Sequence, residues 1–411
     1  MTLRRNAQQG LACPWQQGLI ALIVLGGLLM PVTKAFALWD DKLKPFVEEK
    51  VTRDDNVFRL SKDVAPETVG ASSRGDTYRT TSLGLNLDLP VSRQRFQAAF
   101  TRNDTRYDQL SGLDFTGHEA RAVWLWRVGN DVSGQLGYTE SLALASFAYI
   151  QRATPNPLKT QQAFYNADWL VTPRWRIQSG VIGLEQSNSE PVFQVNDVKI
   201  LISDIALSYV TPANTSVGLG VRSEGGRFPN PRGNTLDNAY SQYGVNLVAE
   251  WTPTGASRVN ARAGRVSRRY GESSPRDFDG NTARIDYDWK PTGKLSLTAV
   301  AQRDISVYED IRTSFVLAKG VTLRPTLRVT EKLEMSGAFE YYVRDYLGDP
   351  GGVGGTPNRT DRVRSATATI SYKPVRALAL MLSAQREART SNVASVDYEV
   401  DVVSLAARIT F

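Results

Sequence analysis

Cysteine and histidine are almost missing from this sequence, which has one of each, Cys13 and His118, among 411 residues. Cys13 lies in an N-terminal stretch that we expect to be removed, so the mature chain would form no disulfide and have no thiol chemistry. His118 follows Gly117 in an expected loop, with no nucleophile beside it that a histidine base would activate. We therefore predict no metal site, no cofactor and no enzymatic activity.

Long apolar runs are confined to the N-terminus. Arg4 and Arg5 give a positive leader, Leu19–Met30 is a short apolar core, and Ala35–Ala37 has the small-residue cleavage pattern. These features indicate a secretory signal peptide over residues 1–37, cut after Ala37. The core is short for a membrane-spanning helix, and no later run approaches the about 18 apolar residues that such a helix needs.

The net charge of the chain is also small. Removing Arg4, Arg5 and Lys34 with the leader lowers the formal net charge from +7 to +4. This excess is too small to indicate a nucleic-acid-binding protein. It gives a slight preference for an anionic partner.

What the sequence has instead is alternation with a period of two. Between Ile285 and Ala299, apolar and polar residues alternate on both sides of a turn that contains Pro291 and Gly293. Successive strand side chains point to opposite sides, so this segment predicts a β-hairpin with one apolar face. Similar turns recur about every 40 residues, which predicts antiparallel strands in up-and-down order. They lie at Leu89–Pro90, Trp126–Gly129, Trp169–Pro173, Tyr209–Pro212, Trp251–Gly255, Val329–Glu331 and Tyr372–Pro374.

A soluble all-β fold and a membrane barrel both fit this repeat, and three features favour the barrel. Alternating apolar residues, Leu405, Ala407 and Ile409, lead to a terminal Phe411, as in the assembly signal of bacterial outer-membrane proteins. Turns on one side are short, whereas the returns on the other side are long and polar. Aromatic residues precede the short turns at matching depth, as in the girdle of a membrane barrel. They are Trp126, Trp169, Tyr209, Trp251, Trp289 and Tyr372.

We therefore predict an all-β fold, a transmembrane antiparallel up-and-down β-barrel of about 18 strands, or 16. Residues 38–45 would be a short periplasmic segment and residues 46–411 the barrel. Phe46–Leu60 is the expected first strand, and Asp397–Phe411 the closing strand that pairs with it.

Lipid-facing rows are expected at Leu83 to Leu89, Tyr243 to Trp251 and Leu333 to Val343. The polar residues between them must face inward, because a charge that faces lipid costs about 2–4 kcal/mol at the membrane midplane. A polar interior at this strand number predicts a water-filled lumen. Gly348–Gly355 is a candidate for a constriction inside it, with an ordinary surface loop as the alternative.

Arginines followed by an acid or an amide recur toward the far ends of the strands. If they share a depth, they form a charged collar that guides a polar or anionic chain, because guanidinium groups match carboxylate, phosphate and sugar oxygens. The alternative is that they form pairs with lumenal acids and brace the wall. The candidates are Arg53, Arg102, Arg222, Arg268, Arg303, Arg344 and Arg386.

The stretch from Phe46 to Leu60 carries one further signal. Its core, formed by Asp54, Asp55, Asn56, Phe58 and Arg59, resembles the opening strand of the EpsL-like proteins. These are outer-membrane barrel porins encoded with exopolysaccharide biosynthesis genes, including exosortase-associated loci. Over the rest of the mature chain the resemblance is one of architecture. The family has no established catalytic residues, so none is inferred for this chain.

The resemblance implies passage of an exopolysaccharide across the bacterial outer membrane. The expected partners are then a polysaccharide chain, with a lean toward an anionic one, outer-membrane lipid, the barrel assembly machinery and periplasmic export components, but no nucleic acid. Two alternatives stay open. One is a general diffusion porin for small polar solutes, and the other is a structural or adhesive outer-membrane barrel.

Overall fold

The computed structural model describes residues 42–148, 152–213, 215–230, 239–271, 276–306, 315–347 and 359–411. Within it, Leu43–Phe411 forms one compact unit. The expected signal peptide, its cleavage after Ala37 and the candidate constriction at Gly348–Gly355 lie outside the described residues. Among the described residues, no helix is long and apolar enough to cross a membrane.

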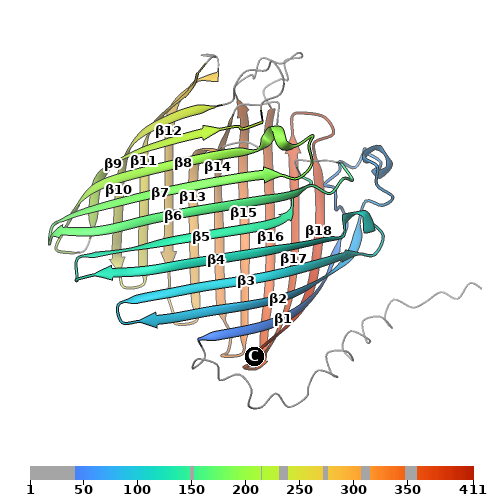
Figure 1. The fold of residues 1–411 in the computed structure, drawn as a ribbon, viewed down its shortest axis with the longest axis horizontal. Coiled ribbons are helices and arrows are strands. Elements are labelled where there is room, and N and C mark those ends of the chain that lie inside the picture. The colour runs from blue at the N-terminus through green and yellow to red at the C-terminus, as the bar shows by residue number, and fades with distance from the viewer. Residues whose placement is uncertain are drawn as a thin grey trace, which may run out of the picture. The chain divides into compact units, whose positions relative to one another are not determined.

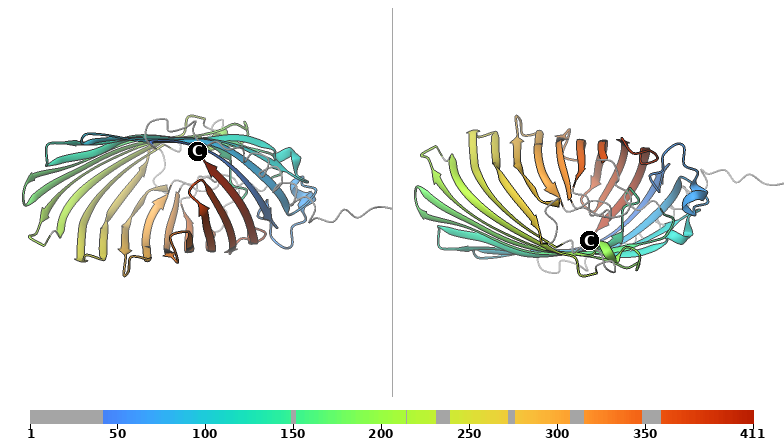
Figure 2. Two further views of the ribbon diagram at one scale, coloured as in Figure 1. Left: turned by 90° about the horizontal axis from the view of Figure 1, so that it is seen from below. Right: turned by 90° about the horizontal axis from the view of Figure 1, so that it is seen from above.

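In the described part of the chain, eighteen antiparallel strands form one closed sheet, which confirms the predicted transmembrane barrel. Each strand pairs with its neighbours in chain order, and β1 pairs with both β2 and β18. Early and late strands form opposite walls (Figure 1), and the ring they form is flattened (Figure 2). The strands are β1 (Leu43–Asp54), β2 (Asp76–Val91), β3 (Gln94–Tyr107), β4 (Phe115–Val128), β5 (Val132–Leu144), β6 (Pro157–Thr172), β7 (Trp175–Asn188), β8 (Val198–Val210), β9 (Ser216–Arg227), β10 (Tyr240–Thr254), β11 (Ser257–Tyr270), β12 (Phe278–Trp289), β13 (Leu295–Ser306), β14 (Phe315–Arg328), β15 (Leu333–Leu347), β16 (Arg359–Val375), β17 (Leu378–Ser391) and β18 (Tyr398–Thr410).

The two faces of the sheet differ in the way that alternation predicts. On β10, the side chains of Tyr243, Val245 and Leu247 are more than half exposed, whereas the alternate residues Gln242 and Asn246 are buried. The exposed apolar side chains form the outer, lipid-facing surface. Directly paired residues in an antiparallel sheet lie on the same face, so the register carries this assignment from strand to strand around the barrel.

The two ends of the barrel also differ as expected. The turns on one side, which we call the short-turn rim, have two to five residues, and the connections at the other side, the long-loop rim, have from six to 21. The aromatic girdle lies on the outer face near the short-turn rim, with Trp169, Trp251 and Tyr372 all well exposed. Both the girdle and the loop asymmetry are therefore confirmed.

Two local expectations are wrong. The first strand begins at Leu43 and ends at Asp54 instead of continuing to Leu60, because the chain turns inward after Asp54. His118 does not lie in a loop but inside β4, where it is paired with Arg102 on β3 and Leu142 on β5. The closing strand is correct, since β18 pairs with β1 from Thr410 to Val402.

Candidate functional site

Four of the seven candidate arginines face outward and cannot line the lumen. Arg102 is paired with Leu83, which is 53% exposed, and Arg53 is paired with Val403, which is 48% exposed. Arg303 lies two residues after the exposed Ala301, and Arg386 lies two residues after the exposed Ala384. Strand residues two apart point to the same side, so both arginines also face outward. The prediction of one inward collar is therefore wrong for these four residues.

Three candidates, Arg222, Arg268 and Arg344, face inward, but they differ in access. Arg268 is fully buried, with Nε 2.8 Å from Gln242 Oε1 and Nη2 3.1 Å from Glu224 Oε1. It is one of the arginine–acid braces that we considered as the alternative. Arg344 is paired in register with Asp361, and the side chain of Arg222 keeps 25% of its surface exposed.

Arg222 lies on the lumen wall with two further arginines that the sequence analysis did not single out. The others are Arg262 on β11 and Arg284 on β12, and these two are directly paired across the strands. Like charges in a directly opposed pair destabilise a sheet. We call Arg222, Arg262 and Arg284 the lumenal arginine set.

Acidic and amide groups hold this set in place. The Arg284 guanidinium donates through Nε and Nη2 to both carboxylate oxygens of Asp286, at 2.8 and 2.6 Å, and through Nη1 to Gln302 Oε1 at 2.6 Å. Arg262 Nη2 lies 3.5 Å from Asp304 Oδ2. Arg222 is the least constrained, since its Nη2 lies 4.0 Å from Glu224 Oε2.

The wall is hollowed around these side chains. One hollow of about 620 Å3 contains Arg222 and Arg262 together with Asp204, which is paired directly with Arg222. A second of about 440 Å3 contains Arg262 and Arg284. The lining thus offers donors and acceptors of both charges next to open space, an arrangement that hydrogen-bonds polar solutes without favouring one sign strongly.

Toward the short-turn rim, a further ion-pair group continues the pattern. Arg176 Nη2 lies 2.8 Å from Glu250 Oε2 and donates to Ser216 Oγ at 3.1 Å. Arg176 Nε lies 3.6 Å from Asp168 Oδ2. Charged groups of both signs therefore line the wall of β6 to β12 from this rim to the lumenal arginine set.

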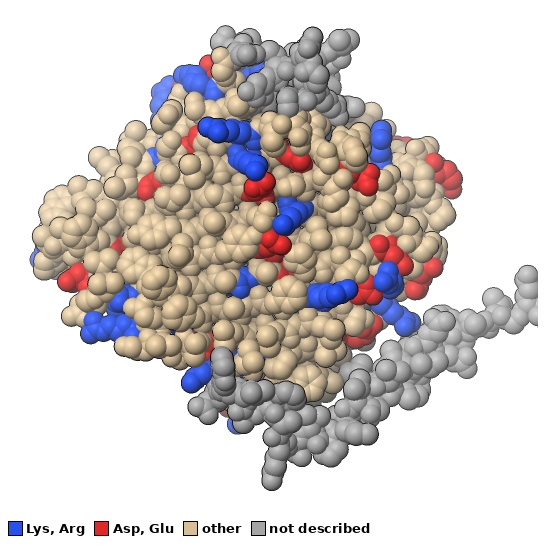
Figure 3. All heavy atoms as spheres, in the orientation of Figure 1, with Lys and Arg blue, Asp and Glu red and all other residues tan. Residues whose placement is uncertain are grey.

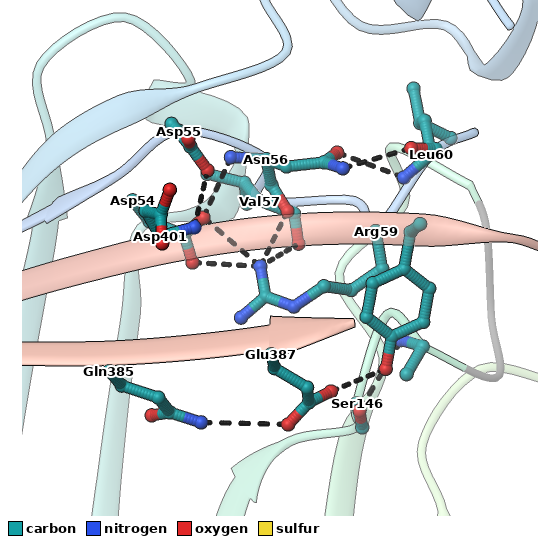
Figure 4. A network of polar contacts seen from close by, with 12 residues as sticks. Asp54, Asp55, Asn56, Val57, Arg59, Leu60, Ser146, Gln385, Glu387 and Asp401 are labelled. Atoms are coloured by element: carbon teal, nitrogen blue, oxygen red, sulfur yellow. Dashed lines mark hydrogen bonds and ion pairs between the residues drawn. The ribbon is translucent and has the colours of Figure 1, made fainter. Parts of the chain in front are cut away.

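The motif that resembles EpsL-like proteins has a structural role at the long-loop rim. The Arg59 guanidinium donates through Nη1 to the Asp54 carboxylate at 2.8 Å and to the Asn56 carbonyl oxygen, as Figure 4 shows. Asn56 donates through Nδ2 to the Leu60 and Glu399 carbonyl oxygens at 2.9 Å and accepts from Leu60 N–H at 2.9 Å. Arg59 adopts a positive φ of 56°, which this network maintains.

Phe58, the apolar member of the motif, anchors a packed cluster of loops. Its side chain is fully buried, and its ring contacts that of Phe147 edge-on, with 4.9 Å between the centroids. Leu60, Leu110 and Leu113 are buried in the same cluster. We call the described residues that form it, 55–75, 108–114, 145–148 and 152–156, the loop cap.

The loop cap covers part of the inner wall near the long-loop rim. Arg389, an inward residue of β17, donates through Nη1 to the Ala148 carbonyl oxygen at 2.8 Å, so the cap reaches from β5 to β17. The side chains of Asp54, Asp76 and Tyr398 face inward and are buried. The loop cap therefore covers their lumenal side. The lumen is therefore narrowed in this sector.

His118 has partners on the outer face. Its Nε2 lies 2.9 Å from Glu140 Oε1, and the Glu140 carboxylate also accepts from the Tyr138 hydroxyl at 2.6 Å and lies 3.4 Å from Lys159 Nζ. In the part of the chain that the structure describes, no three His, Cys, Asp or Glu side chains gather as metal ligands.

The sequence of the second half of the barrel matches a known family. Residues 243–411, from within β10 to the terminal phenylalanine, match the family described as "Putative beta-barrel porin 2". None of the curated proteins matches the sequence at a significant level.

Several solved structures of Pseudomonas porins are similar to this chain at low identity. OccK1 (OpdK) of Pseudomonas aeruginosa is 12% identical, with 90% of this chain and 99% of that chain covered and a TM-score of 0.46. OccK3 (OpdO) of the same species is 14% identical, with 90% and 96% covered and a TM-score of 0.43. A BenF-like porin from Pseudomonas fluorescens Pf-5 is 10% identical, with 90% and 99% covered and a TM-score of 0.46. The barrel and its apolar outer surface agree on an outer-membrane β-barrel, and the family match over its second half is consistent with this.

Proposed function

We propose that this protein is a passive pore for small polar solutes across the outer membrane. The observation that carries the proposal is the lumenal arginine set, where Arg222 and Arg262 line a hollow of about 620 Å3 opposite the carboxylate of Asp204. Paired charges on an inner wall let a solute exchange its water for hydrogen bonds without being held tightly, which favours passage over capture.

The lining also favours weak charge selectivity. Arg284 is matched by Asp286, and Arg262 by Asp304, so neither sign dominates the wall next to the hollows. Solute size would then decide passage more than solute charge. The loop cap supports this view, since it narrows the mouth on the side of β1 to β5.

Export of an exopolysaccharide is a second candidate. The observation in its favour is the resemblance of Asp54 to Arg59 to the EpsL-like proteins. These residues fold into the loop cap, where they could affect how wide a chain the mouth admits. On this reading a polysaccharide and periplasmic export components would be the partners, and the lumenal arginine set would contact an acidic polymer.

A liposome-swelling assay tests the main proposal. The purified, refolded protein is inserted into vesicles, which are then diluted into isotonic solutions of a pentose, a disaccharide or a large dextran. We expect fast swelling in the pentose, slower swelling in the disaccharide and none in the dextran. The matched control is the same protein heat-denatured before reconstitution.

The same vesicles separate the two candidates. If neither the pentose nor the disaccharide enters, the diffusion pore is excluded. If vesicles loaded with a labelled acidic polysaccharide release it only when the folded protein is present, the export function is favoured instead.

A further inference from the structure

A groove of about 880 Å3 lies on the outer surface of the barrel, across β6 to β11. Its apolar walls are side chains that face the membrane and are between 39% and 64% exposed. They are Tyr165, Val181, Ile205, Val221, Tyr243 and Val245. Asp204 and Arg222 also border the groove, although the register places their side chains on the lumen face of the same strands.

Small residues create the depression. One row of paired outward residues runs across the strands from Val181 through Ser203, Ser223 and Tyr243 to Ser267. Three of these five are serines, whose short side chains leave space between larger neighbours on a face that elsewhere carries bulky apolar residues. Their hydroxyl groups give the floor of the groove hydrogen-bonding capacity.

Arg265 contributes a positive charge at one end of the groove. It is paired with Val245 and so belongs to the outward row that also contains Val221 and Ile205. The acidic residues of the next segment, Asp277 and Asp279, pair with Arg269 at 3.6 and 2.7 Å. Asp279, paired with Ser267 on the same outward face as Arg265, forms its ion pair with Arg269.

The positive charge of Arg265 in this position favours an anionic partner. An arginine that faces hydrocarbon costs up to about 2–4 kcal/mol, and the cost falls toward the interface, where headgroup phosphates lie. The outward cations Arg53, Arg102 and Arg386 lie toward the same long-loop rim. Figure 3 shows charged side chains of both signs scattered among uncharged residues over the visible face.

We propose that the groove binds one membrane lipid with a phosphate headgroup. The acyl chains lie against Val181, Ile205, Val221 and Val245, and the phosphate accepts hydrogen bonds from the Arg265 guanidinium. The serine hydroxyls hydrogen-bond to the ester or sugar oxygens between phosphate and chains. The charge of Arg265 and the apolar walls together select an amphiphile, and this holds whether or not solutes pass through the lumen.

Native mass spectrometry of the full-length folded barrel in detergent tests this site with three matched probes. Dioleoylphosphatidic acid has both chains and phosphate, dioleoylglycerol lacks the phosphate, and glycerol 3-phosphate lacks the chains. We expect one tightly retained dioleoylphosphatidic acid, weaker retention of dioleoylglycerol and no competition by glycerol 3-phosphate. Equal retention of dioleoylglycerol, or competition by glycerol 3-phosphate, would overturn the proposal.

Three variants then locate the site. Arg265→Gln should weaken retention of dioleoylphosphatidic acid about fivefold, the effect of one cation beside an anionic headgroup. Ser223→Phe should fill the groove and abolish retention, while heat-modifiable migration confirms that the barrel is folded. Arg386→Gln, on the distant β17 and paired with Glu399 and Asp401, should leave retention unchanged. If Arg386→Gln weakens retention as much as Arg265→Gln, or if Ser223→Phe has no effect, the groove is not the site.

Discussion

Arg222 and Asp204 form an opposed pair of charges on the lumen wall. They are directly paired across β8 and β9 and line the same hollow. Because no ion pair holds them within 4.0 Å of each other, each can act on a passing ion separately. Neutralising either one therefore changes the field in the lumen with little change in the wall.

Opposite shifts in ion selectivity are expected from the two neutral variants. Arg222→Gln should make the pore more selective for cations, and Asp204→Asn should make it more selective for anions, each by about twofold, from a screened interaction of about 0.5 kcal/mol across a water-filled radius. Reversal potentials under a salt gradient in planar bilayers measure both. Unchanged potentials in both variants would mean that ions do not pass this part of the wall.

Asn56 is the central hydrogen-bonding residue of the loop cap, with its side chain satisfied by Leu60 and Glu399 while being 3% exposed. Asn56→Ala should destabilise the folded barrel by about 1–3 kcal/mol, because buried backbone groups lose their partners. Urea unfolding in lipid vesicles measures the change. Asn130→Ala, at an exposed position of the short-turn rim, is the control, and equal effects of the two variants would contradict this role for the motif.

The facing of the outward arginines follows from the alternation of side chains along each strand. Arg102 lies two residues after Phe100, and Arg386 lies four residues after Leu382, so both have the parity of lipid-facing residues. Counting by two from the apolar rows places them on the outer face. The partners of Arg268 and Arg284 were not predictable in this way, because they depend on register between strands.

At the scale of the strands, glycines packed against aromatic rings recur as paired positions. Gly84 is paired with Phe46, Gly137 with Phe164, and a Cβ built on either glycine would lie 2.2 or 2.3 Å from the ring. Such pairs let an aromatic ring cover the glycine of the neighbouring strand and help a sheet to curve. They explain why many strands here tolerate glycine at inward positions.

A pair of alanine variants tests this packing. Gly137→Ala should lower the free energy of unfolding by about 1–3 kcal/mol, since the added methyl group displaces the Phe164 ring. Gly183→Ala, where nothing lies within 4 Å of the added atom, should change it by less than about 0.5 kcal/mol. Urea unfolding midpoints measure both changes, and equal midpoints for the two variants would argue against ring packing as the cause.

The hairpins themselves were predictable, because alternation and short turns are local properties of the sequence. The end of β1 was not. Polar residues such as Asp54 and Asn56 continue a strand-like pattern in the sequence. Their side chains nevertheless bind loop backbone atoms. The loop cap that contains these contacts is built from three separate connections between strands. Contacts between residues distant in sequence decided this boundary.

For the whole molecule, one arrangement explains both faces of the sheet. Apolar residues cover the outer surface, while ion pairs such as those of Arg176 and Arg284 line the inner wall. The loop cap narrows one sector of the mouth. The central claim is that water fills the remaining passage from rim to rim.

The most direct test is the single-channel conductance of the purified, refolded protein in a planar lipid bilayer. A water-filled lumen predicts stepwise insertions with a steady conductance that rises in proportion to the conductivity of the KCl bath. Protein that is folded by heat-modifiable migration, and shown by flotation to be in the membrane, but gives no current above that of the bare bilayer, would contradict the account.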